Sequence, residues 1–222
     1  MRYEDILDTA LGELSLVNQS LKWAQIAVLA SSPSQRRSAH TVTSSSYVLI
    51  AAVVENFVRS TVARLGQDIR ATGVPMREVK TSLLSIFGNN HLVSIRDIRD
   101  YQKSWIKKIE LLAMPDSSFP LGELSADLPL DGKTIRPVHL ETIWSIFSMP
   151  LSPFPNLLCR VALTDIADGR NEIAHGHISI ETFAKSKGNI DTIKKISRIE
   201  ELLTHITICS MEYISTKAYR KA

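Results

Sequence analysis

Apolar residues recur every three or four positions along most of the chain, which is the spacing of amphipathic helices. The pattern predicts a first long helix over residues 3–29 and a second over residues 47–65 that continues to about Arg70. Between them, residues 31–46 are polar and rich in Ser and Thr, with Pro33 inside the stretch. Such residues favour turns, so most of this segment is predicted to be loop.

The later helices are predicted at residues 79–87, 94–114, 139–147, 157–175 and from 189 to about 218. Gly176 is a natural C-terminal stop for the helix over residues 157–175. We find no repeat of fixed period and no convincing run of strands. The fold class is therefore predicted to be all-α, in the form of an antiparallel helical bundle.

Seven of the nine prolines lie between Pro115 and Pro155. We interpret residues 115–155 as a Pro-rich insertion within a single helical domain that covers residues 1–222. The segment is not a linker between two domains, because the last helices have to pack on the first ones to bury their apolar faces.

The composition, with 44% hydrophobic and 22% charged residues, is that of an ordinary globular protein. There is no apolar run of about 18 residues, which a membrane-spanning helix needs. The acidic start of the chain is unlike a signal peptide. We expect a soluble, cytoplasmic protein with no membrane partner. The net charge of +3 permits a polyanionic partner without demanding one.

The two cysteines, Cys159 and Cys209, lie inside apolar helical patterns and form no C-x-x-C pair. Buried thiols in a reducing compartment are therefore expected in preference to a disulfide.

The chemistry is concentrated in residues 169–177, which read G-R-N-E-I-A-H-G-H. On a helix, Asn171 and His175 are four residues apart and lie on nearly the same face. Arg170 is five residues before His175, about 140° around the axis, and its long side chain can close much of that gap. A fixed cation, a carboxamide and an imidazole are thus expected together near the end of a helix.

These three groups suit RNA cleavage by attack of the 2′-hydroxyl on the adjacent phosphate. Histidine transfers protons near neutral pH, and the arginine fork fits phosphate oxygens. The reaction needs no metal or other cofactor, and none is expected here. Two other interpretations stay open: the polar groups cap a helix end, or His175 and His177 bind a metal. The second lacks further ligands at typical spacing.

The stretch R-N-E-I-A-H-G-H resembles the R-x-x-x-x-H hallmark of the HEPN superfamily, especially its MAE-type and RiboL-PSP-type branches. Two further blocks are similar to segments of those branches: Y-V-L-I-A-A-V-V-E-N-F-V-R at residues 47–59 and R-P-V-H-L-E-T-I-W-S-I-F-S-M at residues 136–149. The resemblance covers residues 47–213 and implies an all-α bundle that dimerises, with two copies of the motif facing a shared cleft.

The resemblance further implies a metal-independent endoribonuclease of the toxin or anti-phage defence type. Arg170 and His175 would be the catalytic pair, and Asn171 would position them or the RNA substrate. Glu55 would orient Arg170, and His177 would play a supporting role at most. Alternatively, Glu55 is a solvated surface residue, or it pairs with Arg59, which lies four residues on along the same helix face. An antitoxin or a defence-system protein is then an expected partner. The alternative is a non-catalytic HEPN module that binds RNA or protein.

Two basic groups, residues 103–108 and 217–221, have two interpretations each. In the first interpretation, these basic residues hold the RNA backbone, and Trp105 or Tyr219 stacks on a base. Alternatively, the lysines are a solvated helix face, Trp105 belongs to the core, and the C-terminal tail is disordered.

Gly169 is unusual inside a helix, where glycine costs about 1 kcal/mol relative to alanine. Three explanations stay open: the glycine loosens the helix, it lets a second helix approach closely, or it marks a break in the helix.

Overall fold

The computed structural model describes residues 2–29, 32–118, 121 and 134–221, and over these residues the predicted all-α class is confirmed. Three 3-10 turns join the α-helices, at Met76–Glu78, Thr81–Leu83 and Met114–Asp116. In chain order the α-helices are α1 (Tyr3–Ala27), α2 (Pro33–Ala71), α3 (Leu84–Phe87), α4 (Asn89–Asp97), α5 (Tyr101–Ala113), α6 (Pro137–Phe147), α7 (Leu157–Ala174), α8 (Ile180–Lys187) and α9 (Asn189–Ser215).

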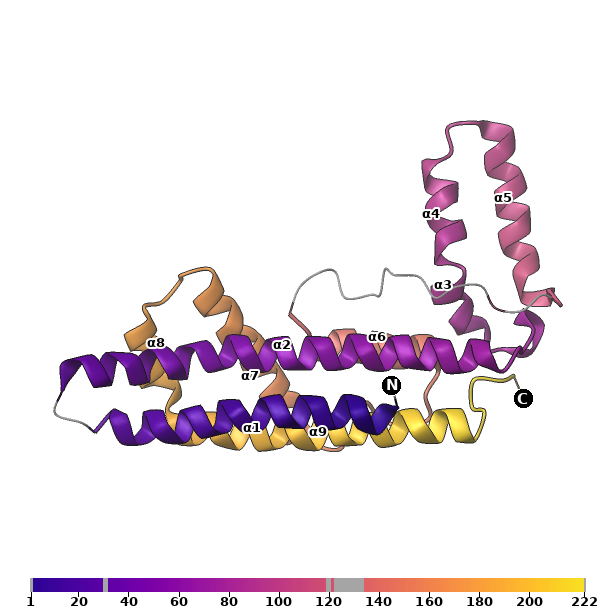
Figure 1. Cartoon of the computed structure of the whole chain (residues 1–222). Coiled ribbons are helices and arrows are strands. Elements are labelled where there is room, and N and C mark those ends of the chain that lie inside the picture. The colour runs from indigo at the N-terminus through magenta and orange to yellow at the C-terminus, as the bar shows by residue number, and fades with distance from the viewer. Residues whose placement is uncertain (1, 30–31, 119–120, 122–133, 222) are drawn as a thin grey trace.

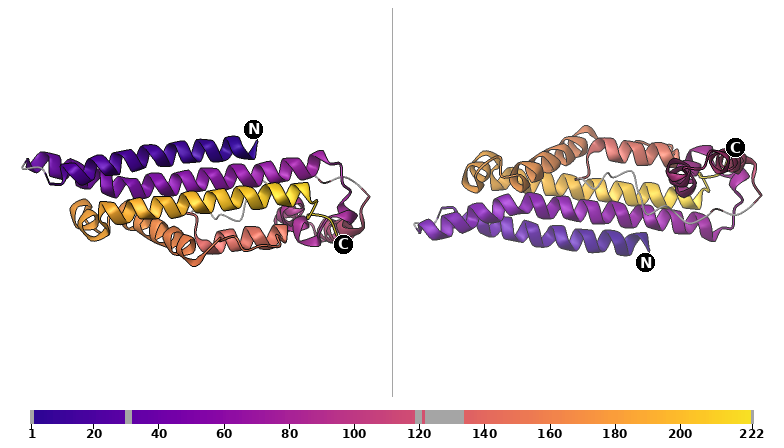
Figure 2. Two further views of the ribbon diagram at one scale, coloured as in Figure 1. Left: turned by 90° about the horizontal axis from the view of Figure 1, so that it is seen from below. Right: turned by 90° about the horizontal axis from the view of Figure 1, so that it is seen from above.

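The body of the molecule is an elongated bundle of α1, α2, α9 and α7, with α6 alongside (Figure 1). Seen from above or below, α1 lies at one edge, α6 and α7 lie at the other, and α2 and α9 lie between them (Figure 2). One continuous cluster of buried side chains draws on all of these helices, including Leu21, Phe57, Phe147, Leu163 and Leu203. Burial of their apolar stripes is what holds the bundle together.

The prediction of a loop over residues 31–46 is wrong. The second helix begins at Pro33 and runs through the whole Ser- and Thr-rich stretch. Thr43 and Ser44 are buried there, and the Thr43 hydroxyl donates to the Ala39 carbonyl. Packing against α8 and α9 outweighs the weak helix propensity of these residues, because propensity differences are under about 1 kcal/mol per residue.

The single helix predicted over residues 94–114 is also wrong. The chain forms two helices, α4 and α5, which project from one end of the bundle as a hairpin (Figure 1). Asp100 starts α5 by accepting a hydrogen bond from the Lys103 backbone nitrogen. Trp105 is 49% exposed, so it does not belong to the core, and the Lys108 ammonium lies 4.6 Å from the centre of its ring.

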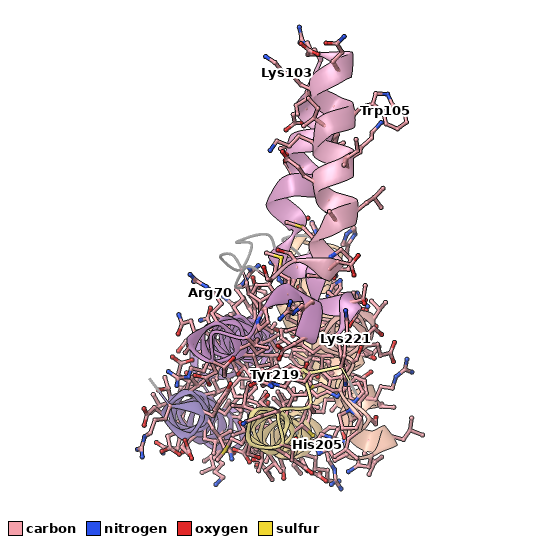
Figure 3. The ribbon with its side chains drawn as sticks, turned by 90° about the vertical axis from the view of Figure 1, so that its right-hand side faces the viewer. Arg70, Lys103, Trp105, His205, Tyr219 and Lys221 are labelled. Carbon is pink, nitrogen blue, oxygen red and sulfur yellow. The ribbon has the colours of Figure 1, made fainter. Side chains whose placement is uncertain are left out.

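The C-terminal residues pack against the bundle, contrary to the expectation of a disordered tail. Tyr219 is buried beside Tyr213, and its carbonyl accepts a hydrogen bond from the Lys80 backbone nitrogen. Figure 3 shows Tyr219 within the bundle, far from Trp105 on the projecting hairpin. Tyr219 is therefore unable to stack on a base.

The Pro-rich insertion contains α6, whose Leu140, Ile143, Trp144 and Phe147 are buried in the shared core. Residues 119–120 and 122–133 of the insertion lie outside the described residues. Cys159 and Cys209 are buried free thiols, which confirms that prediction. No helix in the described ranges is long and apolar enough to cross a membrane.

Candidate functional site

The motif lies at the C-terminal end of α7, as the sequence predicts. Asn156 begins the helix by accepting a hydrogen bond from the Cys159 backbone nitrogen. The helix ends at Ala174, with His175 as the C-cap, and Gly176 follows at φ +64°, a conformation that favours glycine. The backbone nitrogen of His177 donates to the Glu172 carbonyl, so the turn after the helix is hydrogen-bonded.

Gly169 is present because another helix approaches closely, and α7 is unbroken at this position. A Cβ atom there would lie 2.7 Å from Cε1 of Tyr47 and 3.0 Å from Cζ of Phe183. Both rings are fully buried and meet edge to face, with centroids 4.9 Å apart. Lys195 of α9 donates to the Tyr47 hydroxyl at 3.4 Å. Four helices, α2, α7, α8 and α9, therefore fix the position of the motif.

Arg170 and Asn171 are in contact. The Arg170 side chain is half-buried, and its Nη1 donates to Oδ1 of Asn171 at 3.3 Å. The same amide oxygen accepts a hydrogen bond from the Thr134 hydroxyl, also at 3.3 Å. The Asn171 amide oxygen thus accepts from both Arg170 and Thr134, and a positioning role for it stays a prediction.

His175 and His177 are exposed, and their ring centroids lie 5.6 Å apart. Among the described residues, no hydrogen bond joins either imidazole to Arg170. The structure therefore gathers the motif into two adjoining pairs, Arg170 with Asn171 and His175 with His177. Asn171 and His175 are one helical turn apart, and the predicted polar edge shared with Arg170 stays a prediction.

The structure brings Thr134 and Arg136 to the motif helix, and the sequence pattern predicts neither of them as a site residue. Arg136 Nη2 lies 2.7 Å from Oδ1 of Asp168, one turn before Asn171. Arg136 is also the N-cap of α6, where its backbone nitrogen donates to the His139 ring. The block over residues 136–149 marks this stretch of the sequence, but its pattern does not predict which helix Arg136 meets.

Glu55 forms its ion pair within α2, and no described hydrogen bond or ion pair joins it to Arg170. Its carboxylate accepts from Arg59 Nε at 3.0 Å, one turn along α2. Tyr47, which contacts Gly169, is eight residues before Glu55, so about 12 Å of helix separates the two positions. The pairing with Arg59 accounts for the Glu55 carboxylate without a role in the motif.

The basic residues on the hairpin are also remote from the motif. Lys103 and Trp105 project at the end of the bundle where α2 ends (Figure 3), whereas the motif lies near α8 at the other end (Figure 1). Of the two arginines at the motif, Arg170 and Arg136, Arg136 is paired with Asp168.

In the described part of the chain, no three His, Cys, Asp or Glu side chains gather in a way that could hold a metal ion. Comparison of the chain with models of known protein families, with curated proteins and with solved structures gives no match. The fold is all-α, with an Arg–Asn pair and a His–His pair at the end of α7, and the assignment to HEPN proteins stays a prediction.

Proposed function

We propose that this protein is a metal-independent endoribonuclease of the HEPN type, acting in a toxin or anti-phage defence system. The observation that supports it best is the pair of exposed imidazoles, His175 and His177, at the end of the helix that carries Arg170, whose guanidinium donates to Asn171. Exposed histidines next to a positioned arginine provide proton transfer and phosphate recognition at one place.

The reaction follows from the chemistry of these groups. His175 takes the proton of the ribose 2′-hydroxyl, whose oxygen attacks the adjacent phosphorus. The bond from phosphorus to the 5′-oxygen breaks, and that oxygen takes a proton from water, with His177 in a supporting role. Arg170 stabilises the negative charge that develops on the phosphate oxygens. The products are a 2′,3′-cyclic phosphate and a 5′-hydroxyl, so atoms and protons balance without a metal.

The test is cleavage of end-labelled tRNA and of an mRNA in excess EDTA by the wild type, His175→Ala and His205→Ala. His205 is the matched control, because it contacts Ser152 just before the start of α7 and so lies at the opposite end of a helix about 27 Å long. We expect wild type and His205→Ala to leave 2′,3′-cyclic ends and His175→Ala to lose activity at least ~100-fold.

Equal cleavage by the wild type and His175→Ala would remove His175 from the mechanism. Absence of cleavage by the wild type, together with unchanged binding of RNA or of a partner protein by His175→Ala, would favour the non-catalytic module instead.

A further inference from the structure

A hollow of about 450 Å³ lies between α7 and α9, which run side by side in the bundle (Figure 2). Its volume is within the range of about 300–1,000 Å³ that is typical of small-molecule sites. Of the described residues that line it, none belongs to the motif over residues 169–177. The hollow is therefore a separate feature of the motif helix, nearer to its N-terminal end.

Two polar bridges between α7 and α9 mark the ends of the hollow. Asn156 Nδ2 donates to Oε1 of Glu201 at 2.7 Å, and Lys195 Nζ lies 3.6 Å from Oδ2 of Asp165. The two helices are therefore antiparallel, and the bridges are about 13 Å apart along α7. A hollow bounded at both ends in this way suits a short ligand rather than a docked helix.

The wall that α7 contributes is apolar. Leu158 and Val161 line the hollow, and their exposed fractions are 56% and 47%. The two residues are three positions apart, so they share one side of the helix. Ala162 of α7 and Ser197 of α9 also line the hollow, and these small side chains leave the space between the helices open.

The wall that α9 contributes is cationic. Lys194 and Arg198 are four residues apart, so they share one side of α9, and both line the hollow. Arg198 pairs at the surface with Glu201 at 2.9 Å, which is a weak interaction. Among the described residues, no carboxylate lies within ion-pair distance of Lys194. Two like charges at this spacing repel each other, and an anion placed between them would relieve that repulsion.

We propose that this hollow binds a small amphipathic anion, an aliphatic carboxylate whose head group lies between Lys194 and Arg198 and whose chain covers Leu158 and Val161. The two cations provide charge-assisted hydrogen bonds to the carboxylate oxygens. The chain removes the two exposed apolar side chains from water. An apolar lining with a few polar groups that fix the orientation is the usual composition of a ligand site.

The remaining charges limit the ligand to a single head group. At one end of the hollow, the Lys195 ammonium is held by Asp191 at 3.0 Å and by Asp165. A polyanion such as RNA would bring several phosphates toward these two carboxylates, whereas a ligand with one negative group avoids them. The inference does not rest on the proposed reaction, because it uses none of the motif residues.

The test is calorimetric titration with decanoate, below the concentration at which it forms micelles, of the wild type, Lys194→Gln and Val161→Ser. Lys103→Gln on α5 is the control for charge, and Ile180→Ser is the control for apolar area, because the exposed fraction of Ile180 is also 47%. All four altered residues are exposed, so the folding of each variant should be retained.

We expect saturable binding by the wild type and by both controls. Lys194→Gln should bind at least ~10-fold more weakly, because a charge-assisted hydrogen bond is lost. Val161→Ser should bind at least ~3-fold more weakly, because less apolar area is covered. Decanol, which lacks the charge, and acetate, which lacks the chain, should show no saturable binding.

Amide chemical shifts of nitrogen-labelled wild type locate the ligand. Changes on addition of decanoate should cluster in residues 158–165 and 191–198. A wild type without saturable binding would overturn the proposal. So would equal affinity of the wild type, Lys194→Gln and Val161→Ser, binding of decanol as tight as that of decanoate, or shift changes centred on other helices.

Discussion

Replacing Gly169 with alanine tests how the motif helix is held. In an exposed helix the change from glycine to alanine stabilises by about 1 kcal/mol. At Gly169 the new methyl group would lie 2.7 Å from Cε1 of Tyr47 and even closer to its Cδ1, far inside van der Waals contact. Tyr47 has little room to move, because Phe183 packs against its ring and Lys195 bonds its hydroxyl.

Overpacking of this kind costs about 1–3 kcal/mol, and the fixed ring favours the upper part of that range. After subtraction of the gain in helix propensity, we expect Gly169→Ala to destabilise the fold by about 2 kcal/mol. For a chain of 222 residues this corresponds to a fall in Tm of about 4–8 °C.

The assay is thermal and urea unfolding followed by circular dichroism, with Gly12→Ala as the control. Gly12 lies within α1, and a Cβ atom added there would meet no heavy atom within 4 Å. Gly12→Ala should therefore raise stability by about 1 kcal/mol. If Gly169→Ala proved as stabilising as Gly12→Ala, the close contact between α7 and Tyr47 would be refuted.

Three further outcomes are expected. Asn171→Ala should leave Tm within about 2 °C of the wild type but reduce RNA cleavage at least ~10-fold, because Arg170 loses its hydrogen-bond acceptor. Full cleavage activity of this variant would contradict the positioning role of Asn171. Tyr219→Ala should lower the free energy of unfolding by about 3 kcal/mol in urea titrations, since a fully buried ring is removed, and a change below about 1 kcal/mol would show that the C-terminal residues do not pack on the bundle. Burial raises the pKa of Cys159 to about 11, so about 0.1% of this thiol is ionised at pH 8. A chromogenic disulfide reagent should therefore modify Cys159 slowly in the native protein and rapidly in guanidinium. Rapid reaction in the native protein would refute the burial of this thiol.

The helices with clean apolar spacing could be predicted from the sequence. The first helix is predicted at residues 3–29 and observed at Tyr3–Ala27, and the motif helix is predicted at 157–175 and observed at Leu157–Ala174. Each has a strong apolar stripe and a recognisable end, so the local pattern is sufficient.

The errors arise where local preference and tertiary packing disagree. The segment over residues 31–46 has the composition of a loop, yet Ala39 and Thr43 are buried and the chain is helical from Pro33 onward. In the α4–α5 hairpin the apolar spacing of Trp105 and its neighbours suggests a core face, but the neighbouring helices do not cover it. Neither outcome can be read from a local window, because both depend on which surfaces meet.

Some features of the candidate site likewise follow from the sequence, and others depend on the tertiary structure. The sequence by itself determined the all-α class, the end of α7 at His175 and Gly176, and the presence there of Arg, Asn and two His side chains. These depend on periodicity and on residue types within a few positions of one another. The pairing of Glu55 with Arg59 is local as well, because the two side chains lie one turn apart on one helix. Only the tertiary structure decided that Gly169 admits Tyr47 and that Thr134 and Arg136 reach the motif helix. These contacts join segments more than 30 residues apart, so they were settled by the packing of whole helices.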